Sequence, residues 1–205
     1  MKVLNLYAGI GGNRVLWGGC EVTAVEFNEA IAKAYQDRFP EDKVIIGCAK
    51  QFLLENYKNF DFIWASPPCQ THSRIRKCKV DCKPNKMGTI KAIYPDMSLW
   101  EIIIFLKHHL TRGQKFVVEN VKPYYEPLIK ETVEIDRHLY WSNFQISKIK
   151  INKKQIIEKT NISTLKDFDI SKYKNIKNKQ QVIRNQVDYE IGKHIFDESN
   201  KRGLF

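Results

Sequence analysis

Short apolar runs and helix-like segments alternate along the first part of the chain. Runs rich in Val, Ile and aromatic residues predict strands at residues 3–7, 21–26, 43–46, 60–65 and 115–119. Apolar positions with a helical period predict helices at residues 29–39, 50–57 and 96–110. Strands that alternate with helices favour a mostly parallel sheet with helices on both faces, so the expected fold class is α/β.

The ends of several elements carry signals of their own. Asn28 is the expected N-cap of the first long helix, and Pro40 ends that helix. Residues 133–146, with Asn143 at the expected turn, predict a closing antiparallel hairpin. Residues 181–196 regain apolar spacing and predict a turn followed by a C-terminal helix that packs back on the sheet.

The composition is that of a globular chain. With 205 residues, of which 43% are hydrophobic and 28% are charged, one well-filled domain is expected. The longest apolar runs, such as residues 102–106, are far shorter than the roughly 20 residues of a membrane-spanning helix. Five cysteines at irregular spacings do not form a disulfide framework. We therefore expect a cytoplasmic protein without a signal peptide or a membrane anchor.

The net charge of +11 is concentrated in two segments. Residues 70–94 contain seven Arg or Lys and one Asp, and residues 148–179 contain ten Lys and three acidic residues. The rest of the chain is slightly acidic. This distribution predicts a surface that faces a polyanion such as a nucleic acid. For the second segment, lysines that are merely solvated are an equally good explanation.

Two features lie at strand ends where open parallel sheets bind ligands. Residues 7–12, Tyr-Ala-Gly-Ile-Gly-Gly, form a glycine turn that leaves the backbone accessible to a cofactor, although such a turn can be purely structural. Glu26 ends the second strand, where a carboxylate can accept hydrogen bonds from both ribose hydroxyls of an adenosine. Together they favour an adenosine-containing cofactor.

A second pair of residues follows the fourth and fifth strands. Residues 66–70, Ser-Pro-Pro-Cys-Gln, present the thiol of Cys69 at the edge of the sheet as a candidate nucleophile. Glu119 ends the neighbouring strand, and adjacent strands lie about 4.8 Å apart, so the thiol and the carboxylate could face one pocket. For Cys69 taken alone, a role in packing is the alternative.

The motifs and their order resemble those of the cytosine-5 DNA methyltransferases over nearly the whole chain. Residues 67–70, Pro-Pro-Cys-Gln, match the nucleophile motif of that family, and residues 118–121, Val-Glu-Asn-Val, match its acid motif. Weaker matches are the cofactor loop (4–12), the ribose-binding acid (24–26), a reduced arginine motif (137–141) and the last motif (184–187). The blocks 60–73 and 119–128 are most similar to compact members carried by bacteriophages and prophages.

This resemblance implies a Rossmann-like fold that depends on S-adenosylmethionine, and methylation of double-stranded DNA at cytosine C5 in a bacterial or phage-infected host cell. Cys69 would add to C6 of a flipped cytosine. Glu119 would hold the N3 and amino edge of the base, and Arg137 would orient the O2 carbonyl or the thiolate. S-adenosylhomocysteine would be the second product.

The resemblance also implies which residues contact each ligand. The cofactor residues are Tyr7, Ala8, Gly9, Ile10, Gly11, Gly12, Glu26, Phe27, Cys48, Pro68, Leu99, Asn185 and Val187. The nucleic-acid contacts are Gln70, Ser73, Arg74, Arg76 and Lys77. No metal is expected, because Cys78 and Cys82 with His72 offer too few ligands. Residues 1–147 would form the catalytic domain, 148–180 a small basic insert in place of a target recognition domain, and 181–205 a segment returning to the catalytic domain.

The sequence departs from the family pattern at three places. Asn5 and Cys48 stand where most members have Asp, which would weaken cofactor binding. Residues 136–138, Asp-Arg-His, leave the register of the arginine motif open. Two alternatives to the DNA enzyme therefore remain, a catalytically weak or inactive DNA-binding homologue and a tRNA cytosine-5 methyltransferase. The oligomeric state is left open.

Overall fold

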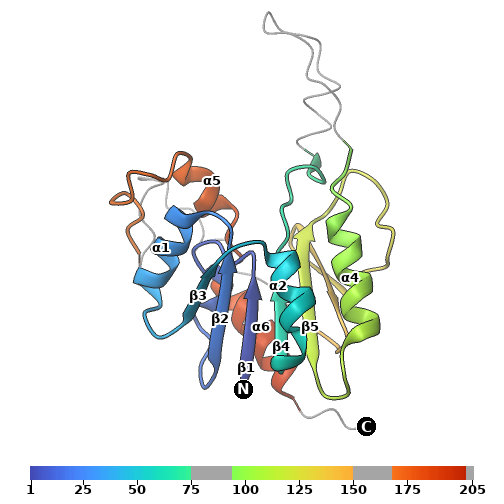
Figure 1. Cartoon of the computed structure of the whole chain (residues 1–205). Helices are drawn as coiled ribbons and strands as arrows, with labels where there is room; N and C mark the ends of the chain where they lie inside the picture. Colours follow the sequence, from blue (N-terminus) through green and yellow to red (C-terminus); the bar gives the residue numbers. More distant parts are fainter. Residues whose placement is uncertain (75–93, 150–167, 202–205) are drawn as a thin grey trace, which may run out of the picture.

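The computed structural model describes residues 1–74, 94–149 and 168–201, which fold around one seven-stranded sheet (Figure 1). The strands are β1 (Lys2–Leu6), β2 (Glu21–Glu26), β3 (Lys43–Ile46), β4 (Phe62–Ala65), β5 (Lys115–Val121), β6 (Val133–Ile135) and β7 (His138–Ser142). The α-helices are α1 (Glu29–Arg38), α2 (Ala49–Asn56), α4 (Ser98–His109), α5 (Lys179–Arg184) and α6 (Tyr189–Asn200). Short 3₁₀ turns are η1 (Gly12–Arg14) and η2 (Tyr57–Asn59).

The strand order is β3-β2-β1-β4-β5-β7-β6. Strands β1 to β5 pair in parallel, and β7 pairs antiparallel with both β5 and β6. The expected mostly parallel sheet with a closing antiparallel hairpin is confirmed. From β1 the chain adds β2 and then β3 on one side, and it then crosses back to add β4 on the other side of β1. The order of the strands therefore reverses between β1 and β4, and we call this place the switch point. Ligands of open α/β sheets bind at such a switch point, beyond the carboxyl ends of the strands.

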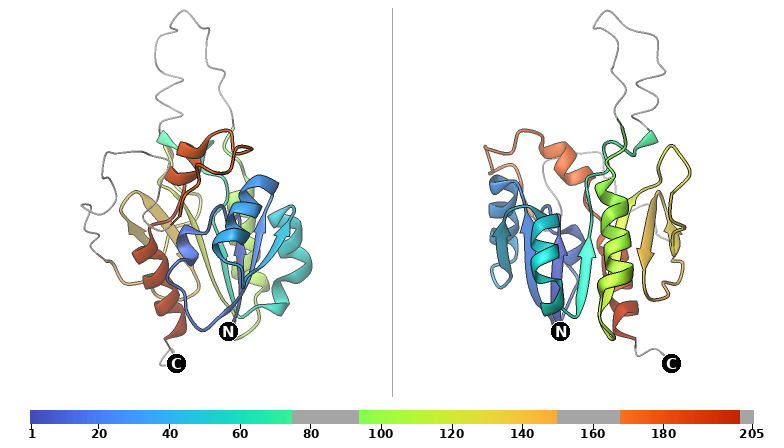
Figure 2. Two further views of the ribbon diagram at one scale, coloured as in Figure 1. Left: turned by 90° about the vertical axis from the view of Figure 1, so that its left-hand side faces the viewer. Right: turned by 45° about the vertical axis from the view of Figure 1, so that its right-hand side comes forward.

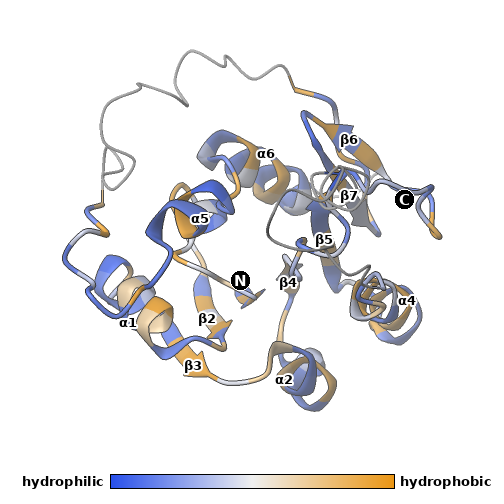
Figure 3. Ribbon diagram, turned by 90° about the horizontal axis from the view of Figure 1, so that it is seen from above, coloured by the Kyte–Doolittle hydropathy of each residue, from blue (hydrophilic) through white to orange (hydrophobic). Residues whose placement is uncertain are grey.

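Helices cover both faces of the sheet, as expected, and Figure 2 shows the layers from two further sides. On one face α2 and α4 bury Leu53 and Ile103 against the sheet. On the other face α6 buries Ile191 and Ile195, and α1 packs through Tyr35. The view along the strands places α6 and α4 on opposite sides of β5 (Figure 3). Among the helices of the described ranges, none has the length and apolar character needed to cross a membrane.

The hairpin exists, but its predicted turn is wrong. The chain reverses at Asp136 and Arg137, and Asp136 takes the left-handed conformation with φ 54°. Asn143 lies beyond β7, where its side chain accepts the Phe116 N–H at 2.9 Å and donates to the Gln114 carbonyl at 2.9 Å. Asn and Asp side chains favour turns and also bond to backbone at strand ends, so composition alone did not separate the two positions.

Residues 181–196, expected to be a turn followed by one helix, contain the end of the short helix α5 and the first part of α6. Asp188 caps α6, and its carboxylate accepts two N–H groups of the first turn, at 2.9 and 3.3 Å. The expectation that this helix packs back on the sheet is confirmed. Trp17 stacks on Phe196 with ring centroids 5.1 Å apart and donates its indole N–H to the Gly192 carbonyl at 3.0 Å.

Within the basic insert, the described stretch of residues 168–178 packs on α1. Ile170, Tyr173 and Ile176 are buried in one cluster with Ile10 of the glycine turn. The lysines of this stretch that face solvent are Lys172, Lys174 and Lys177. Apolar side chains thus attach the stretch to the sheet domain, while its charges point outward.

Candidate active site

The glycine turn and Cys69 follow neighbouring strands at the switch point. Leu6, the last residue of β1, pairs with Ala65, the last residue of β4. The Ser66 N–H extends this pairing by donating to the Leu6 carbonyl at 3.3 Å. Both loops therefore leave the sheet at the same edge, which is the upper edge in Figure 1.

The glycine turn is packed on one side and open on the other. Gly9 and Gly11 have positive φ values of 55° and 76°. A Cβ on Gly11 would lie 2.4 Å from a ring carbon of Phe39, whereas a Cβ on Gly9 would meet no atom within 4 Å. The contact at Gly11 fixes the turn on α1. The open side at Gly9 leaves room for a ligand to approach the backbone.

Glu26 is held by the turn that it faces. One carboxylate oxygen accepts the Gly9 N–H at 3.0 Å, and the other accepts the Asn28 N–H at 2.9 Å. These bonds fix the orientation of the carboxylate and leave lone pairs on both oxygens. A fixed acceptor beside an open glycine backbone fits the ribose of an adenosine-containing cofactor.

An apolar rim continues from Glu26 across the ends of β2 and β3. Phe27 is 80% exposed and Ile46 is 58% exposed, and Cys48 is exposed beside them. Exposed apolar side chains next to a ribose acceptor suit a flat base such as adenine. The residues implied to bind the cofactor thus gather, at Glu26, Phe27 and Cys48, around the open side of the glycine turn.

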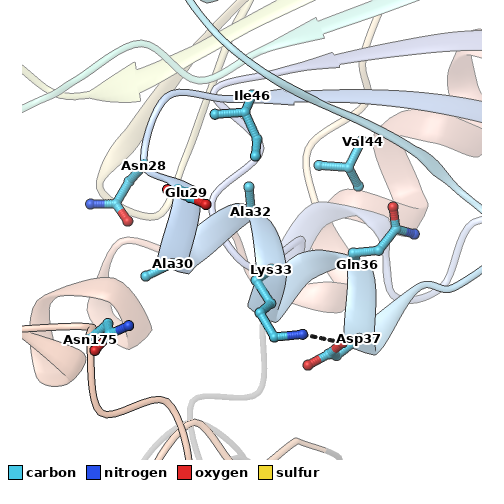
Figure 4. A pocket seen from close by; sticks show the side chains of 10 residues that line it. All are labelled: Asn28, Glu29, Ala30, Ala32, Lys33, Gln36, Asp37, Val44, Ile46 and Asn175. Carbon is cyan, nitrogen blue, oxygen red and sulfur yellow. Dashed lines mark ion pairs between the residues drawn. The ribbon is translucent and has the colours of Figure 1, made fainter.

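A separate groove runs between α1 and the edge strand β3 (Figure 4). Its lining residues are Asn28, Glu29, Ala30, Ala32, Lys33, Gln36, Asp37, Val44, Ile46 and Asn175. It shares Ile46 with the apolar rim, but it contains no residue expected to hold the cofactor. The groove therefore lies beside the candidate cofactor site.

Asn5 lies beneath the glycine turn, away from the apolar rim. It is 1% exposed. The Asn13 amide donates to its oxygen at 2.9 Å, and the Asn5 amide donates back at 3.4 Å. Asn5, which stands where most family members have Asp, therefore forms a neutral hydrogen-bonded pair with Asn13, and this pair supports the turn from inside.

The C-terminal segment closes the far side of the turn. The Val187 carbonyl oxygen lies 2.7 Å from the place that a Cβ on Gly12 would take. Arg38 donates to the Ile10 carbonyl at 2.9 Å and to the Gln186 side chain at 3.2 Å. The segment that resembles the last motif is therefore in contact with the cofactor loop, as the resemblance implies.

Cys69 begins a tight turn after β4. Its carbonyl accepts the N–H groups of His72 and Ser73, both at 3.1 Å. The Asn120 amide of β5 donates to the Pro67 carbonyl at 2.9 Å, which ties this turn to the neighbouring strand. Backbone bonds therefore fix the position of the half-buried thiol.

Two of the side chains expected to be catalytic, Glu119 and Arg137, act electrostatically on the third, Cys69. Burial raises the pKa of the Cys69 thiol, the Glu119 carboxylate raises this pKa further, and Arg137 opposes them. Glu119 is 8% exposed in β5. The thiol is mostly protonated at neutral pH, so a nucleophilic role requires the proton to leave as the reaction begins.

Alkylation of Cys69 by iodoacetamide should report this electrostatic balance. We expect slower alkylation of Cys69 at pH 7.5 than of the exposed Cys48, and a rate at Cys69 that still rises after the pH has passed the ordinary thiol pKa. Arg137→Ala should slow Cys69 by a further factor of about two to three, because it removes the opposing charge. Peptide mass spectrometry between pH 7 and 10 measures both sites. Equal rates at the two cysteines would contradict the assignment of a buried thiol.

The hairpin brings two basic side chains to this site. Arg137 lies at the turn, where its carbonyl accepts the Lys122 N–H at 2.8 Å. Nε2 of His138, the next residue, lies 3.5 Å from Oε1 of Glu119. Sequence analysis assigned Arg137 and missed His138. Strand register was the signal that could have revealed His138. A turn directly before His138 pairs it with Val121, and Val121 lies two residues after Glu119, on the same face of the sheet.

A buried histidine behind Cys69 was also missed. His72 is fully buried, its Nδ1 lies 2.5 Å from the Tyr125 hydroxyl, and its carbonyl accepts the Tyr124 N–H at 3.1 Å. Burial lowers the pKa of His72, so the ring is neutral. The Asp96 N–H donates to the Thr71 hydroxyl at 2.9 Å. The turn after Cys69 is therefore attached both to the chain before α4 and to the chain after β5.

The remaining candidates differ in exposure. Those exposed to solvent are Pro68, Gln70, Arg74 and Asn185, and those buried are Ala8, Ile10 and Leu99. Leu99 is 2% exposed in the core cluster on which Tyr7 packs. Arg76, Lys77, Cys78 and Cys82 lie outside the described residues. Within the described ranges, no three His, Cys, Asp or Glu side chains form a group that could hold a metal ion.

Comparison with known proteins identifies the family. A tRNA (cytosine(38)-C(5))-methyltransferase of Spodoptera frugiperda is 32% identical over 128 residues, which cover 59% of this chain and 35% of that protein. The human protein of the same name is 33% identical over 117 residues, 53% of this chain and 30% of that protein. The chain thus spans about a third of the length of these relatives. A solved structure of a Spodoptera frugiperda DNMT2 mutant superposes with a TM-score of 0.40 at 28% identity, over 59% of this chain and 35% of that one.

A family model described as C-5 cytosine-specific DNA methylase matches residues 1–135. The matched range includes the glycine turn, Glu26, Cys69 and Glu119, and it extends to the end of β6. It covers more than half of the 205 residues. The chain belongs to the C-5 cytosine-specific DNA methylase family.

Proposed function

We propose that this chain methylates C5 of cytosine in a nucleic acid through a transient covalent bond to Cys69. The observation that carries the proposal is the electrostatic coupling of one half-buried thiol to one carboxylate and one guanidinium at the switch point of the sheet. Nucleophilic catalysis on a base needs this combination, because the thiol attacks and charged neighbours stabilise the adduct.

Cys69 loses its proton and its sulfur bonds to C6 of the cytosine, which moves electron density to C5 and N3. Glu119 holds the N3 and amino edge, which selects cytosine and stabilises the adduct. The base must first leave its stack to reach a thiol at the edge of the sheet. C5 would then bond to the methyl group that S-adenosylmethionine supplies, with S-adenosylhomocysteine as the second product. Loss of the C5 proton and cleavage of the C6–S bond then release 5-methylcytosine and return the thiolate of Cys69.

S-adenosylmethionine is the methyl donor of this family, and it supplies an electrophilic methyl group when bound. Glu26 would accept its ribose hydroxyls, since this carboxylate is already oriented by two backbone N–H groups. Phe27 and Cys48 would flank the adenine on the apolar rim. The open side of Gly9 would let the ligand approach the backbone.

Double-stranded DNA is the first candidate substrate, because the matching family is described as a DNA methylase. A tRNA is the second candidate, because the relatives with matching sequences are named as tRNA enzymes. The exposed Lys172, Lys174 and Lys177 of the basic insert suit the phosphates of either polymer. They carry no base specificity of their own.

Transfer of radiolabelled methyl groups to duplex DNA and to tRNA tests both candidates in parallel. We expect label in DNA from the wild-type chain and none from Cys69→Ala in matched reactions. Label in tRNA alone would move the assignment to the second candidate. Cofactor binding without label in either polymer would contradict the proposed activity and favour an inactive homologue.

A further inference from the structure

We propose that His138 is a positioning residue of this active site, which holds the Glu119 carboxylate in the orientation that the cytosine edge requires. The inference rests on the proposed function and adds a residue that the arginine motif does not supply. It starts from the 3.5 Å separation between His138 Nε2 and Glu119 Oε1.

Strand pairing places the two side chains on one face of the sheet. Glu119 of β5 lies directly opposite Tyr140 of β7. Alternate residues of a strand share a face, so His138 lies on the same face as Tyr140 and therefore on that of Glu119. The His138 and Glu119 side chains are only 19% and 10% exposed. A charged pair that is mostly withdrawn from water interacts more strongly than one on the surface.

The other ion pair of the hairpin lies on the opposite face. The Lys122 ammonium contacts both oxygens of Glu134, at 2.8 and 2.9 Å. Glu134 pairs with Leu139, which packs into the core beneath α4, so it shares the face of Leu139 and not that of His138. The ammonium of Lys122 therefore pairs with Glu134 and not with Glu119. A variant of Lys122 removes a positive charge near the hairpin without touching the contact between His138 and Glu119, so it is a matched control.

Other ionisable groups near His138 have partners or roles of their own. Arg137 acts on the Cys69 thiol. The Asp188 carboxylate accepts N–H groups of α6. Burial, followed by Glu119, raises the pKa of Tyr140 well above its ordinary value, so this hydroxyl stays neutral. Among these groups, the geometry pairs the His138 ring with Glu119.

The contact between His138 and Glu119 matters for the reaction because it holds Oε1 of the carboxylate from the side of β7. A carboxylate held in this way keeps one orientation toward the base. An arginine at this position also carries N–H donors that suit a carboxylate, so it can replace the imidazole as the holding group.

The test compares His138→Ala, His138→Arg and the control Lys122→Ala in methyl-transfer assays. We expect His138→Ala to lower kcat about 10- to 100-fold, with the KM for S-adenosylmethionine changed less than about twofold. His138→Arg should restore kcat, because its N–H donors can hold the same carboxylate. Lys122→Ala should keep the wild-type kcat, because its ammonium lies on the other face.

A second readout needs neither substrate nor cofactor. His138→Ala should slow alkylation of Cys69 by a factor of about two to three, because a Glu119 carboxylate that the ring no longer holds can act more strongly on the thiol. His138→Arg should not slow it. Methyl transfer that is unchanged in His138→Ala, or an arginine variant as impaired as the alanine variant, would overturn the role of His138. A wild-type chain that labels no polymer would overturn the proposed function. The alkylation rates would still test the contact between His138 and Glu119 in that case.

Discussion

Wild-type protein is expected to form a gel-stable complex with a nucleic acid that carries 5-fluorocytosine, and Cys69→Ala is expected to form none. Fluorine at C5 blocks the loss of a proton that must precede cleavage of the C6–S bond, so the adduct accumulates. The complex should require S-adenosylmethionine. Methyl transfer to ordinary cytosine should fall by at least about 10⁴-fold in Cys69→Ala, because the covalent path is lost.

Cys20→Ala is the matched control for this experiment, because it removes a half-buried thiol from the same protein at a distance from the switch point. It should trap fluorocytosine as wild type does. Denaturing gels followed by peptide mapping locate the adduct. A complex that persists in Cys69→Ala, or a wild-type chain that binds both ligands without trapping, would refute the assignment of the nucleophile.

Alanine substitutions in the glycine turn should separate folding from cofactor binding. Gly11→Ala forces a side chain into a left-handed conformation and against Phe39, so unfolding free energy should fall by about 3 kcal/mol. Gly9→Ala carries only the conformational penalty, about 1 kcal/mol, because no atom lies within 4 Å of the added carbon. Its affinity for S-adenosylmethionine should nevertheless fall about tenfold or more, because the methyl group fills the open side of the turn.

Urea unfolding measures the first effect, and titration calorimetry measures the second. Gly18→Ala is the control, since Gly18 is exposed, has no positive φ and has no neighbour within 4 Å of a Cβ. It should change neither quantity. If Gly9→Ala binds the cofactor as wild type does, the ligand approaches the sheet elsewhere, and the proposed cofactor site would need revision.

Local signals predicted most of the sheet and its helices. The alternation of strand and helix, with Asn28 capping α1 through a bond from the Ile31 N–H at 3.2 Å, placed five strands and their helices within about two residues. The hairpin turn was misplaced because Asp136 and Asn143 are both plausible turn residues, and only the pairing of β7 with β5 distinguishes them. Register is a tertiary property, which a single strand does not encode alone.

The candidate site was predictable where chemistry and sequence spacing coincide. Cys69 and Glu119 follow adjacent strands, so their proximity could be inferred from the order of elements. His138 could not, because its role depends on the turn that sets the register of β7. The support of Asn5 by Asn13 was equally hidden, since a reciprocal pair of amides arises only when η1 folds over β1. Long-range contacts of this kind leave no local pattern.

The contact between Trp17 and α6 has a consequence for the order in which the chain folds. The indole of Trp17 bonds to Gly192, 175 residues later, and the same helix follows the segment that packs on Gly12. Loop closure over such a separation is slow, and it must wait until the ribosome has synthesised α6. The first strands can pair early, but the glycine turn gains its final shape only when this late helix arrives. Competence to bind a cofactor is therefore among the last properties that a nascent chain acquires, and until then Trp17 is an exposed apolar surface for chaperones.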